Sequence, residues 1–500
     1  MAKQDAAEVE AIERDNATFS VFETLMTPEK IAQVAIVGST VHLAVSKFMQ
    51  SEEDTILFQD ILTTAVAILV GLGVSYRTRI VNNGIHDSLL VRKADILPDF
   101  NTLYLLYLPT FLSLLFARQF TILNLVMTFN YADMAPYMRL PIQTVLVLFN
   151  GQIYDDRFTY IKALGLNCIL AFVLEKVSQL KSFDRVECNL FSILLTNVLF
   201  LIDSPTIHFQ VLQNVLRGFV VAVAVNYPLI KLTSRCNKYL RSALLLSTFV
   251  CVLPLTVMYI FEIDGQNPAV WLYYYISSSS VRIKITFSWL IGLLFLIPNI
   301  MVFKSNFSLD SSRKIWHFIV LILVVPPLKQ DPEFVKIALA GTIVSFLAVE
   351  YLRYLKLAPF GEYFDSKLRS FADFRDDRGP IIISYIYLVI GVASPILIND
   401  SLVGVISLGV GDSLASIVGN RWGRHRWPGT NKTYEGTSAF VVATAACSLS
   451  FKFFLGEFKD VSFTKLMSIC LFSGLLEGNS VLNDNILVPS FMLLIREIFK

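Results

Sequence analysis

The chain has 500 residues, of which 54% are hydrophobic and only 16% are charged, and its mean hydropathy is +0.59. Soluble globular proteins contain about 25% charged residues, so this composition excludes a soluble enzyme of this size and predicts a protein that crosses a membrane several times. The net charge of +2 gives no reason to expect a nucleic-acid partner. The six cysteines are scattered and form no CxxC pair, which argues against a disulfide framework or a cysteine metal site.

Polar residues dominate positions 1–30, and this N-terminal tail lacks the apolar core of a signal peptide. Apolar stretches of membrane-spanning length then follow one another to the end of the chain. The stretches are 31–49, 56–75, 101–117, 119–135, 139–153, 160–178, 189–203, 212–232, 240–261, 285–303, 315–328, 334–352, 381–398, 401–419, 437–455, 463–479 and 485–499. Because several of them are short, we predict an all-α, polytopic integral membrane protein with roughly 13–16 transmembrane helices.

The connections between these stretches divide the chain into two regions. Residues 31–304 have short connections without a cluster of reactive side chains, and we predict an N-terminal multi-span membrane region there. Residues 305–500 carry dense polar groups at 311–317, 353–380, 409–437 and 477–485. We therefore predict that 305–500 is the catalytic region.

The charges of the second region predict on which side of the membrane its loops lie. Lys and Arg concentrate in the loops 353–380 and 420–433, and two predicted spans separate these loops. Loops rich in Lys and Arg face the cytosol, and an even number of spans puts both loops on that side. The same count puts all four polar clusters on one side, so we predict a composite site that faces the cytosol.

The segment 409–437, GVGDSLASIVGNRWGRHRWPGTNKTYEGT, contains the densest of these clusters. Its loop, 420–437, has four cationic side chains, Arg421, Arg424, Arg426 and Lys432, and glycines at 423, 429 and 436 that let backbone N–H groups approach an anion. Guanidinium and ammonium groups bind phosphate oxygens. For the arginines, an ordinary positive loop that only fixes membrane topology is an equally good interpretation.

Three carboxylates stand out in the same region. Asp412 interrupts an apolar run, and a carboxylate at membrane depth usually marks function, although a structural ion pair with a neighbouring helix is the alternative. Glu435 lies three residues after Lys432, where a span begins. Asp484 lies in LNDNILVP, where a surface turn is an equally good interpretation because Asn and Asp favour turns.

Other polar residues give weaker signals. Glu477 resembles Asp484 in its setting but is a weaker candidate, and His317, in RKIWH, is as readily a buried structural histidine as a catalytic one. Asp377, in FRDDRGP, lies in a charge run that is more often solvated than metal-binding. Gly409 and Gly411 indicate a helix break or close packing just before Asp412.

Known phosphotransferase motifs are absent: the chain contains no P-loop and no HRD or DFG triplet. The segment 409–437 nevertheless resembles that of the dolichol kinases, membrane enzymes that transfer phosphate from CTP to dolichol. WPGTNKTYEGT is similar to the CTP-binding segment of that family and DNILVP to its C-terminal signature, while RKIWH and DDRGPIIISYIYLVIG are similar to further family segments. The resemblance covers about the last 200 residues.

The resemblance implies a phosphotransferase that converts CTP and dolichol to CDP and dolichyl phosphate, the lipid carrier of protein glycosylation. It implies an endoplasmic-reticulum membrane location and a divalent metal ion as cofactor. The N-terminal spans would then hold the isoprenoid tail. The implied CTP-binding residues are Arg421, Arg424, Arg426, Trp427, Pro428, Gly429, Thr430, Lys432, Thr433, Gly436 and Thr437.

Charge and placement suggest individual roles. Lys432 and the arginines hold the triphosphate, and Trp422 or Trp427 stacks on a base or anchors at the headgroup layer. Asp412 and Glu435 hold the metal. Asp484 is a second metal ligand or the base that accepts the proton of the dolichol hydroxyl. The supporting residues are Arg313, His317 and Asp377.

Three other interpretations stay open. A kinase for a shorter prenol, such as phytol or farnesol, or a CTP-using cytidylyltransferase shares parts of the same motif. A transporter for an anionic solute would place Asp412 in a discontinuous helix, but it should also show a repeat across two halves, and none is evident. A non-enzymatic membrane scaffold would leave the placement of Asp412 and of KTYEG without a reason.

Overall fold

The computed structural model describes residues 108–149, 157–203, 206–303, 309–369 and 379–500, apart from isolated positions within these ranges, and a few residues between 31 and 73. The predicted N-terminal tail and most of the first two predicted spans lie outside the described residues. Within the described ranges the chain is helical and has no β-strand. The all-α prediction is confirmed.

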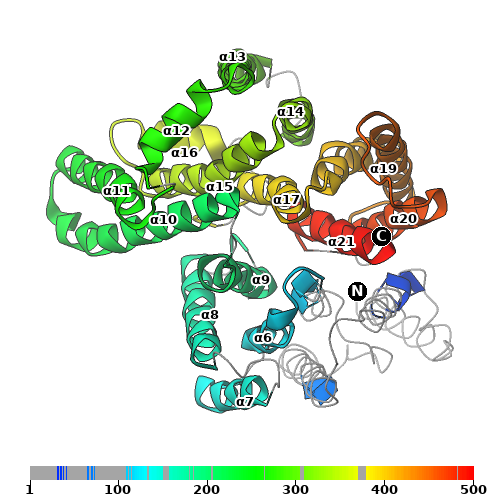
Figure 1. The fold of residues 1–500 in the computed structure, drawn as a ribbon, viewed down its shortest axis with the longest axis horizontal. Helices are drawn as coiled ribbons and strands as arrows, with labels where there is room; N and C mark the ends of the chain where they lie inside the picture. Colours follow the sequence, from blue (N-terminus) through cyan, green and yellow to red (C-terminus); the bar gives the residue numbers. More distant parts are fainter. Residues whose placement is uncertain are drawn as a thin grey trace, which may run out of the picture.

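The described residues form sixteen α-helices, numbered as in Figure 1. They are α6 (Thr121–Met127), α7 (Pro136–Leu148), α8 (Arg157–Ser178), α9 (Arg185–Thr196), α10 (Ile207–Leu232), α11 (Lys238–Ile260), α12 (Pro268–Ser277), α13 (Ser280–Phe303), α14 (Leu309–Gln330), α15 (Pro332–Tyr354), α16 (Gly361–Arg369), α17 (Ser384–Asn399), α18 (Ser413–Trp422), α19 (Tyr434–Phe454), α20 (Phe463–Asn479) and α21 (Asp484–Phe499). Short 3-10 turns cover Arg118–Phe120 (η1), Thr128–Tyr131 (η2) and Thr233–Arg235 (η5), and π-helical segments cover Asn197–Leu201 (η4) and Val405–Asp412 (η8).

Five described helices are long and apolar enough to cross a membrane: α8, α10 with η5, α11, α15 and α19. Two shorter apolar helices lie at Trp316–Gln330 and Ser384–Asn399. The membrane character of the chain is confirmed, whereas the total of roughly 13–16 spans stays a prediction. Two predicted spans differ from the structure: 119–135 consists of three short helical pieces, and 401–419 contains the π-helical segment η8 before α18.

The helices form two groups in Figure 1, with α6–α9 on one side of the molecule and α10–α21 on the other. Within the larger group, α10 packs on α11 and α15, α17 on α15 and α21, and α19 on α18, α20 and η8. The main core cluster contains buried side chains from both groups, such as Leu123 and Ile193 from the first and Ile396 and Phe491 from the second. Helices on both sides of residue 304 share this core, and the predicted division of the chain into two regions at that residue stays a prediction.

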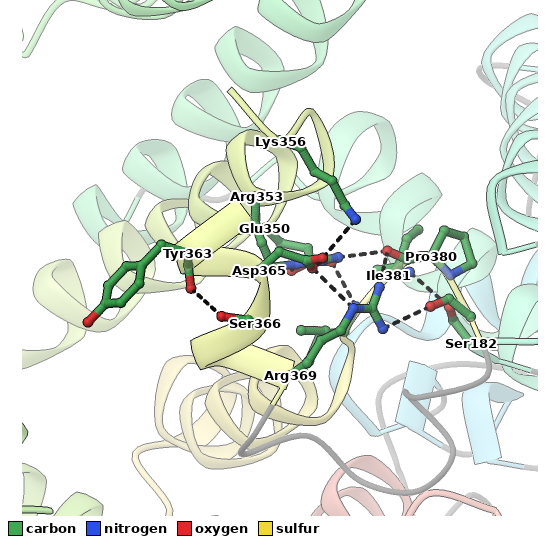
Figure 2. A network of polar contacts seen from close by, with 12 residues as sticks. Ser182, Glu350, Arg353, Lys356, Tyr363, Asp365, Ser366, Arg369, Pro380 and Ile381 are labelled. Atoms are coloured by element: carbon green, nitrogen blue, oxygen red, sulfur yellow. Dashed lines mark hydrogen bonds and ion pairs between the residues drawn. The ribbon is translucent and has the colours of Figure 1, made fainter. Parts of the chain in front are cut away.

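A buried polar network holds the start of α17 in place (Figure 2). Arg353, on α15, binds both carboxylate oxygens of Glu350, at 2.7 and 2.5 Å, and also contacts Asp365 of α16 and the carbonyl oxygen of Pro380. The backbone N–H of Ile382 donates to Glu350 at 2.7 Å. Buried ions are tolerated only when they are paired and hydrogen-bonded, and this network pairs them while it fixes the chain that leads into α17.

Two glycines let α17 approach its neighbours closely. A Cβ atom added at Gly391 would lie 1.7 Å from the carbonyl oxygen of Asn485, on α21. One added at Gly404, just before η8, would lie 2.3 Å from the carbonyl oxygen of Gly391. Small residues allow helix backbones to meet in this way inside membranes, so α17, α21 and η8 form one tightly packed unit.

We expect Gly391→Ala to destabilise the protein, because the added methyl group meets backbone and the helices must separate. Overpacking of this kind costs about 1–3 kcal/mol or more. Gly165→Ala, in α8, is the matched control, since no heavy atom lies within 4 Å of its added Cβ and helical Ala is more stable than Gly by about 0.5–1 kcal/mol. Thermal inactivation of the detergent-purified variants measures both effects, and equal half-lives for the two would contradict the packing described.

Candidate active site

The loop between α18 and α19 folds back on itself and delivers Lys432 to the start of α19. Arg426 and Thr433 form an antiparallel bridge, and the N–H of Trp427 donates to the carbonyl oxygen of Lys432 at 2.9 Å. Thr433 caps α19, since its hydroxyl accepts from the N–H of Gly436 at 3.1 Å. Lys432 therefore directly precedes the N-terminus of α19, where the helix dipole favours an anion.

Trp427 fastens this loop to the end of α20. Its side chain is only 5% exposed, its indole N–H donates to the Thr437 hydroxyl at 2.9 Å, and its ring lies 4.2 Å from that of Tyr434. A Cβ at Gly478 would come within 2.6 Å of the indole nitrogen. The structure therefore contradicts the interpretation of Trp427 as a ring exposed for stacking or for membrane anchoring; Trp422 is the exposed one, at 63%.

Lys432 is held between two carboxylates from two helices. Its ammonium group lies 2.9 Å from the carboxylate of Glu477, at the end of α20, and 2.8 Å from that of Asp484, at the start of α21. It also donates to the carbonyl oxygen of Glu477 at 2.7 Å. Burial lowers the pKa of Lys432, but the attraction of Asp484 and Glu477 outweighs burial and raises that pKa above its ordinary value. Lys432 is therefore fully cationic at neutral pH.

Asp412 forms a second buried cluster with α14. The residue is 7% exposed and ends the π-helical segment η8. Its carboxylate accepts from the ammonium group of Lys314 at 2.6 Å and lies 3.1 Å from the Nδ1 atom of His317. Gly411 brings this segment against α19, since a Cβ there would lie 2.6 Å from Thr444. The expected close packing before Asp412 is confirmed, and the backbone there continues as a π-helical stretch rather than breaking.

The two clusters lie close together at one end of the helices. A Cβ added at Gly411, next to Asp412, would lie 2.7 Å from the ring of Phe440, and one added at Gly474, on α20, would lie 3.3 Å from the same ring, so η8 and α20 both pack against this part of α19. The side chain of Asn485 donates to the carbonyl oxygen of Ser384 at 3.3 Å, so α21 and α17 both begin at this end. The network of Figure 2 lies just before Ser384. These contacts connect the starts of α17 and α21 with the network around Arg353 and with the Lys432 cluster.

Several predicted residues lie apart from this centre or outside the described residues. Glu435 accepts from the Nδ1 atom of His425 at 2.7 Å, and no described contact joins it to Asp412. Arg421, Arg424 and Arg426 are exposed, and none of them forms an ion pair with a described residue. Pro428 is also exposed, while Thr430 contacts the carbonyl oxygen of Gly478 at 3.4 Å. Gly429, Asp377 and the side chain of Arg313 lie outside the described residues.

Comparison with known proteins identifies the family. The dolichol kinase of Saccharomyces cerevisiae is 42% identical over 409 residues, which cover 80% of this chain and 78% of that protein. The chain belongs to the dolichol kinase family.

Other matches agree with this membership of the dolichol kinase family. The model of the dolichol kinase N-terminal domain matches residues 1–203. The dolichol kinase of Homo sapiens is 30% identical over 284 residues, or 51% of this chain and 52% of that protein. A phytol kinase of Synechocystis is 33% identical over 90 residues, or 17% of this chain and 39% of that protein. No solved structure matches the chain.

The sequence analysis missed Lys314, which pairs with Asp412, because it took Arg313 and His317 as the supporting residues. The spacing carried a signal, since Lys314 and His317 are three residues apart and share a helix face. Glu477 was the weaker candidate, yet it contacts Lys432 as closely as Asp484 does. Its setting at the end of an apolar helix gave no indication of the loop that folds onto it.

The resemblance to the dolichol kinases implies a divalent metal ion, and the carboxylates of the site are its candidate ligands. Among the described residues, no three His, Cys, Asp or Glu side chains converge in a way that would hold a metal ion by themselves. Mg²⁺ is commonly held by one or two carboxylates together with substrate phosphates. Glu477 and Asp484, which share the ammonium group of Lys432, provide two such carboxylates, and this donor set fits a metal that binds together with a nucleotide.

We expect Asp412→Asn to destabilise the protein by about 3–5 kcal/mol, because it leaves the buried Lys314 without its counter-charge. The double variant Lys314→Met with Asp412→Asn removes both charges and should recover most of the lost stability. Thermal unfolding of the purified proteins measures the recovery. If the single and double variants unfold at the same temperature, the ion pair is not what holds η8 to α14.

Proposed function

We propose that this member of the dolichol kinase family transfers the terminal phosphate of CTP to dolichol, with Lys432, Glu477 and Asp484 at the centre of the site. The observation that carries the proposal is the ammonium group of Lys432, held within 2.9 Å of two carboxylates at the end of α20 and the start of α21. Phosphoryl transfer needs positioned positive charge and little covalent chemistry from the protein. Family membership supports a lipid alcohol as the acceptor.

The nucleotide phosphates bind to the loop 420–437 and the start of α19. The ammonium group of Lys432 binds the phosphate oxygens, and the positive end of the α19 dipole lies next to the loop that carries Lys432. Arg421, Arg424 and Arg426 add positive charge from exposed positions without competing ion pairs among the described residues. Thr433 and Gly436 shape the helix start through their hydrogen bond, while Trp427 and Thr437 secure the loop.

Asp484 accepts the proton of the attacking hydroxyl. The oxygen of dolichol forms a bond to the terminal phosphorus, the bond from that phosphorus to the bridging oxygen of CDP breaks, and the hydroxyl proton passes to the carboxylate. In the structure, the carboxylate of Asp484 is paired with Lys432 at 2.8 Å. A bound phosphate competes for the same ammonium group, which releases the carboxylate to act as a base.

A divalent metal ion supplies charge that neutralises the phosphate oxygens when it is bound. Glu477 is the residue of this chain that would hold it together with the phosphates, because its carboxylate already lies at Lys432, and Asp484 then serves as the base. Asp412 does not hold the metal in this proposal, because its carboxylate is paired with Lys314 at 2.6 Å. The earlier assignment of Glu435 as its partner on the metal is less suited, because Glu435 is bonded to His425.

We place the protein in the endoplasmic-reticulum membrane with the site facing the cytosol. The positive charge of the loop 420–433 supports this orientation, and the resemblance to the dolichol kinases supports the compartment. A site at the membrane surface is accessible to both substrates, because CTP arrives from the cytosol and dolichol arrives from within the membrane.

The decisive experiment uses membranes that contain the full chain, CTP labelled in its terminal phosphate, Mg²⁺ and dolichol. We expect label in dolichyl phosphate with CTP but not with ATP. Lys432→Ala should lower the rate by about 100-fold or more, because it removes a charge that stabilises the transition state. Lys459→Ala, which changes an exposed lysine between α19 and α20, is the matched control and should keep the wild-type rate.

The other outcomes identify the alternatives. Label in phytol or farnesol but not in dolichol would indicate a shorter-chain prenol kinase. Release of pyrophosphate instead of CDP would indicate a cytidylyltransferase. The absence of labelled lipid with every alcohol would contradict the proposal and favour the transporter. A Lys432→Ala variant with near-normal turnover would overturn the assignment of the site.

The orientation predicts the labelling of single cysteines at the two ends of α19. In a chain whose native cysteines are replaced, we expect Asn431→Cys to react with a membrane-impermeant maleimide in sealed microsomes whose cytosolic face is outward. Lys459→Cys, which is equally exposed at the other end of α19, should react only after the membrane is permeabilised. The reverse pattern would place the site on the lumenal side.

A further inference from the structure

An apolar cavity of about 460 Å³ lies between the two groups of helices. Its wall on the N-terminal side includes Phe116, Phe120 and Leu190, and its wall on the C-terminal side includes Ile390, Ile486 and Leu487. Among the polar residues of the wall, Asn124 and Asn197 are hydrogen-bonded to each other at 2.8 Å. The volume is that of a binding site for a small organic molecule, for which about 300–1,000 Å³ is typical.

The cavity is elongated along α17. Tyr387, Ile390, Ser394 and Ile398 all line it, and their spacing puts them on one face of that helix. Eleven residues of α-helix rise about 16 Å, so the cavity follows α17 through much of its length. A linear apolar chain fits a space of this form better than a compact ligand does.

One end of the cavity lies beside the first turn of α21, which carries Asp484, although Asp484 itself is not part of the wall. Asn483 and Ile486 line the cavity, and Asp484 lies between them in the first turn of α21. Its carboxylate contacts Lys432 at 2.8 Å. Tyr387 also lines the cavity and lies in the first turn of α17, five residues after Ile382, whose N–H donates to Glu350.

The charge of the lining restricts the occupant. The charged side chains in the wall, Glu187 and Asp203, are both acidic. Acidic walls disfavour a phospholipid headgroup or free phosphate, because like charges repel in a low-dielectric setting, whereas a neutral alcohol is not repelled.

We propose that this cavity binds the hydroxyl-bearing end of dolichol, with the first isoprene units along α17 and the hydroxyl group at Asp484. The proposal rests on the proposed function, because it assigns the acceptor of that reaction to a place. The rest of the chain exceeds the volume of the cavity and extends into the membrane. The N-terminal helices α6 and α9 would thus contribute substrate-binding residues.

Ser394→Phe tests the cavity by filling it half-way along α17. We expect the KM for dolichol to rise by about ten-fold, equivalent to about 1.4 kcal/mol, while the KM for CTP is unchanged. Ser450→Phe, which adds the same ring at an exposed position of α19, is the matched control and should leave both constants unchanged. Ser490→Phe fills the cavity from α21 and replaces Ser394→Phe if that variant does not fold.

Photo-crosslinking decides the same question without catalysis. A polyprenol with a diazirine in its first isoprene units is added to the wild-type protein in membranes, and labelled peptides are mapped. We expect label on α9 and α17, removed by excess dolichol. Wild-type protein that fails to phosphorylate dolichol would sink the proposed function alone, whereas label outside the cavity walls, or an unchanged KM for dolichol in both cavity variants, would overturn the cavity assignment.

Discussion

The ammonium group of Lys432 joins three parts of the chain, because it contacts the carboxylates of α20 and α21 from the loop that precedes α19. Unpaired charges are costly at the edge of a membrane, so the three groups stabilise one another only while the loop stays folded. The hairpin, the Thr433 cap and the buried Trp427 keep it folded. A bound phosphate that displaces the two carboxylates becomes the new partner of the ammonium group of Lys432. The charge of Lys432 is therefore paired both before and after the nucleotide binds, so that neither binding nor release of the nucleotide leaves it unpaired.

Close helix packing brings this cluster to the cavity. Gly391 and Gly404 bring α17 against α21 and η8 at backbone distance, and the same α17 carries the cavity wall. The network around Arg353 fixes the chain before α17. The position of Asp484 relative to the apolar space therefore follows from backbone contacts rather than from side chains that rearrange easily.

The sequence analysis identified the loop 420–437, Asp412, Lys432 and Asp484, because charged residues are rare in apolar sequence and stand out by position. It misjudged Trp427, since a tryptophan in a basic loop has the same local signature whether its ring is buried or exposed. It paired Glu435 with Asp412, although the hairpin turns Glu435 toward His425. That turn depends on backbone bonds across the loop, which residue types alone do not encode.

The sequence by itself determined the membrane class, the helical fold and the family, because hydropathy and a local motif need no knowledge of distant contacts. Only the tertiary structure decided the partners of each charge: Lys314 for Asp412, and Glu477 with Asp484 for Lys432. Those partners come from helices far apart in the chain, and their meeting depends on which helices pack together. The cavity is likewise a property of the packing, since its walls combine segments from both ends of the protein.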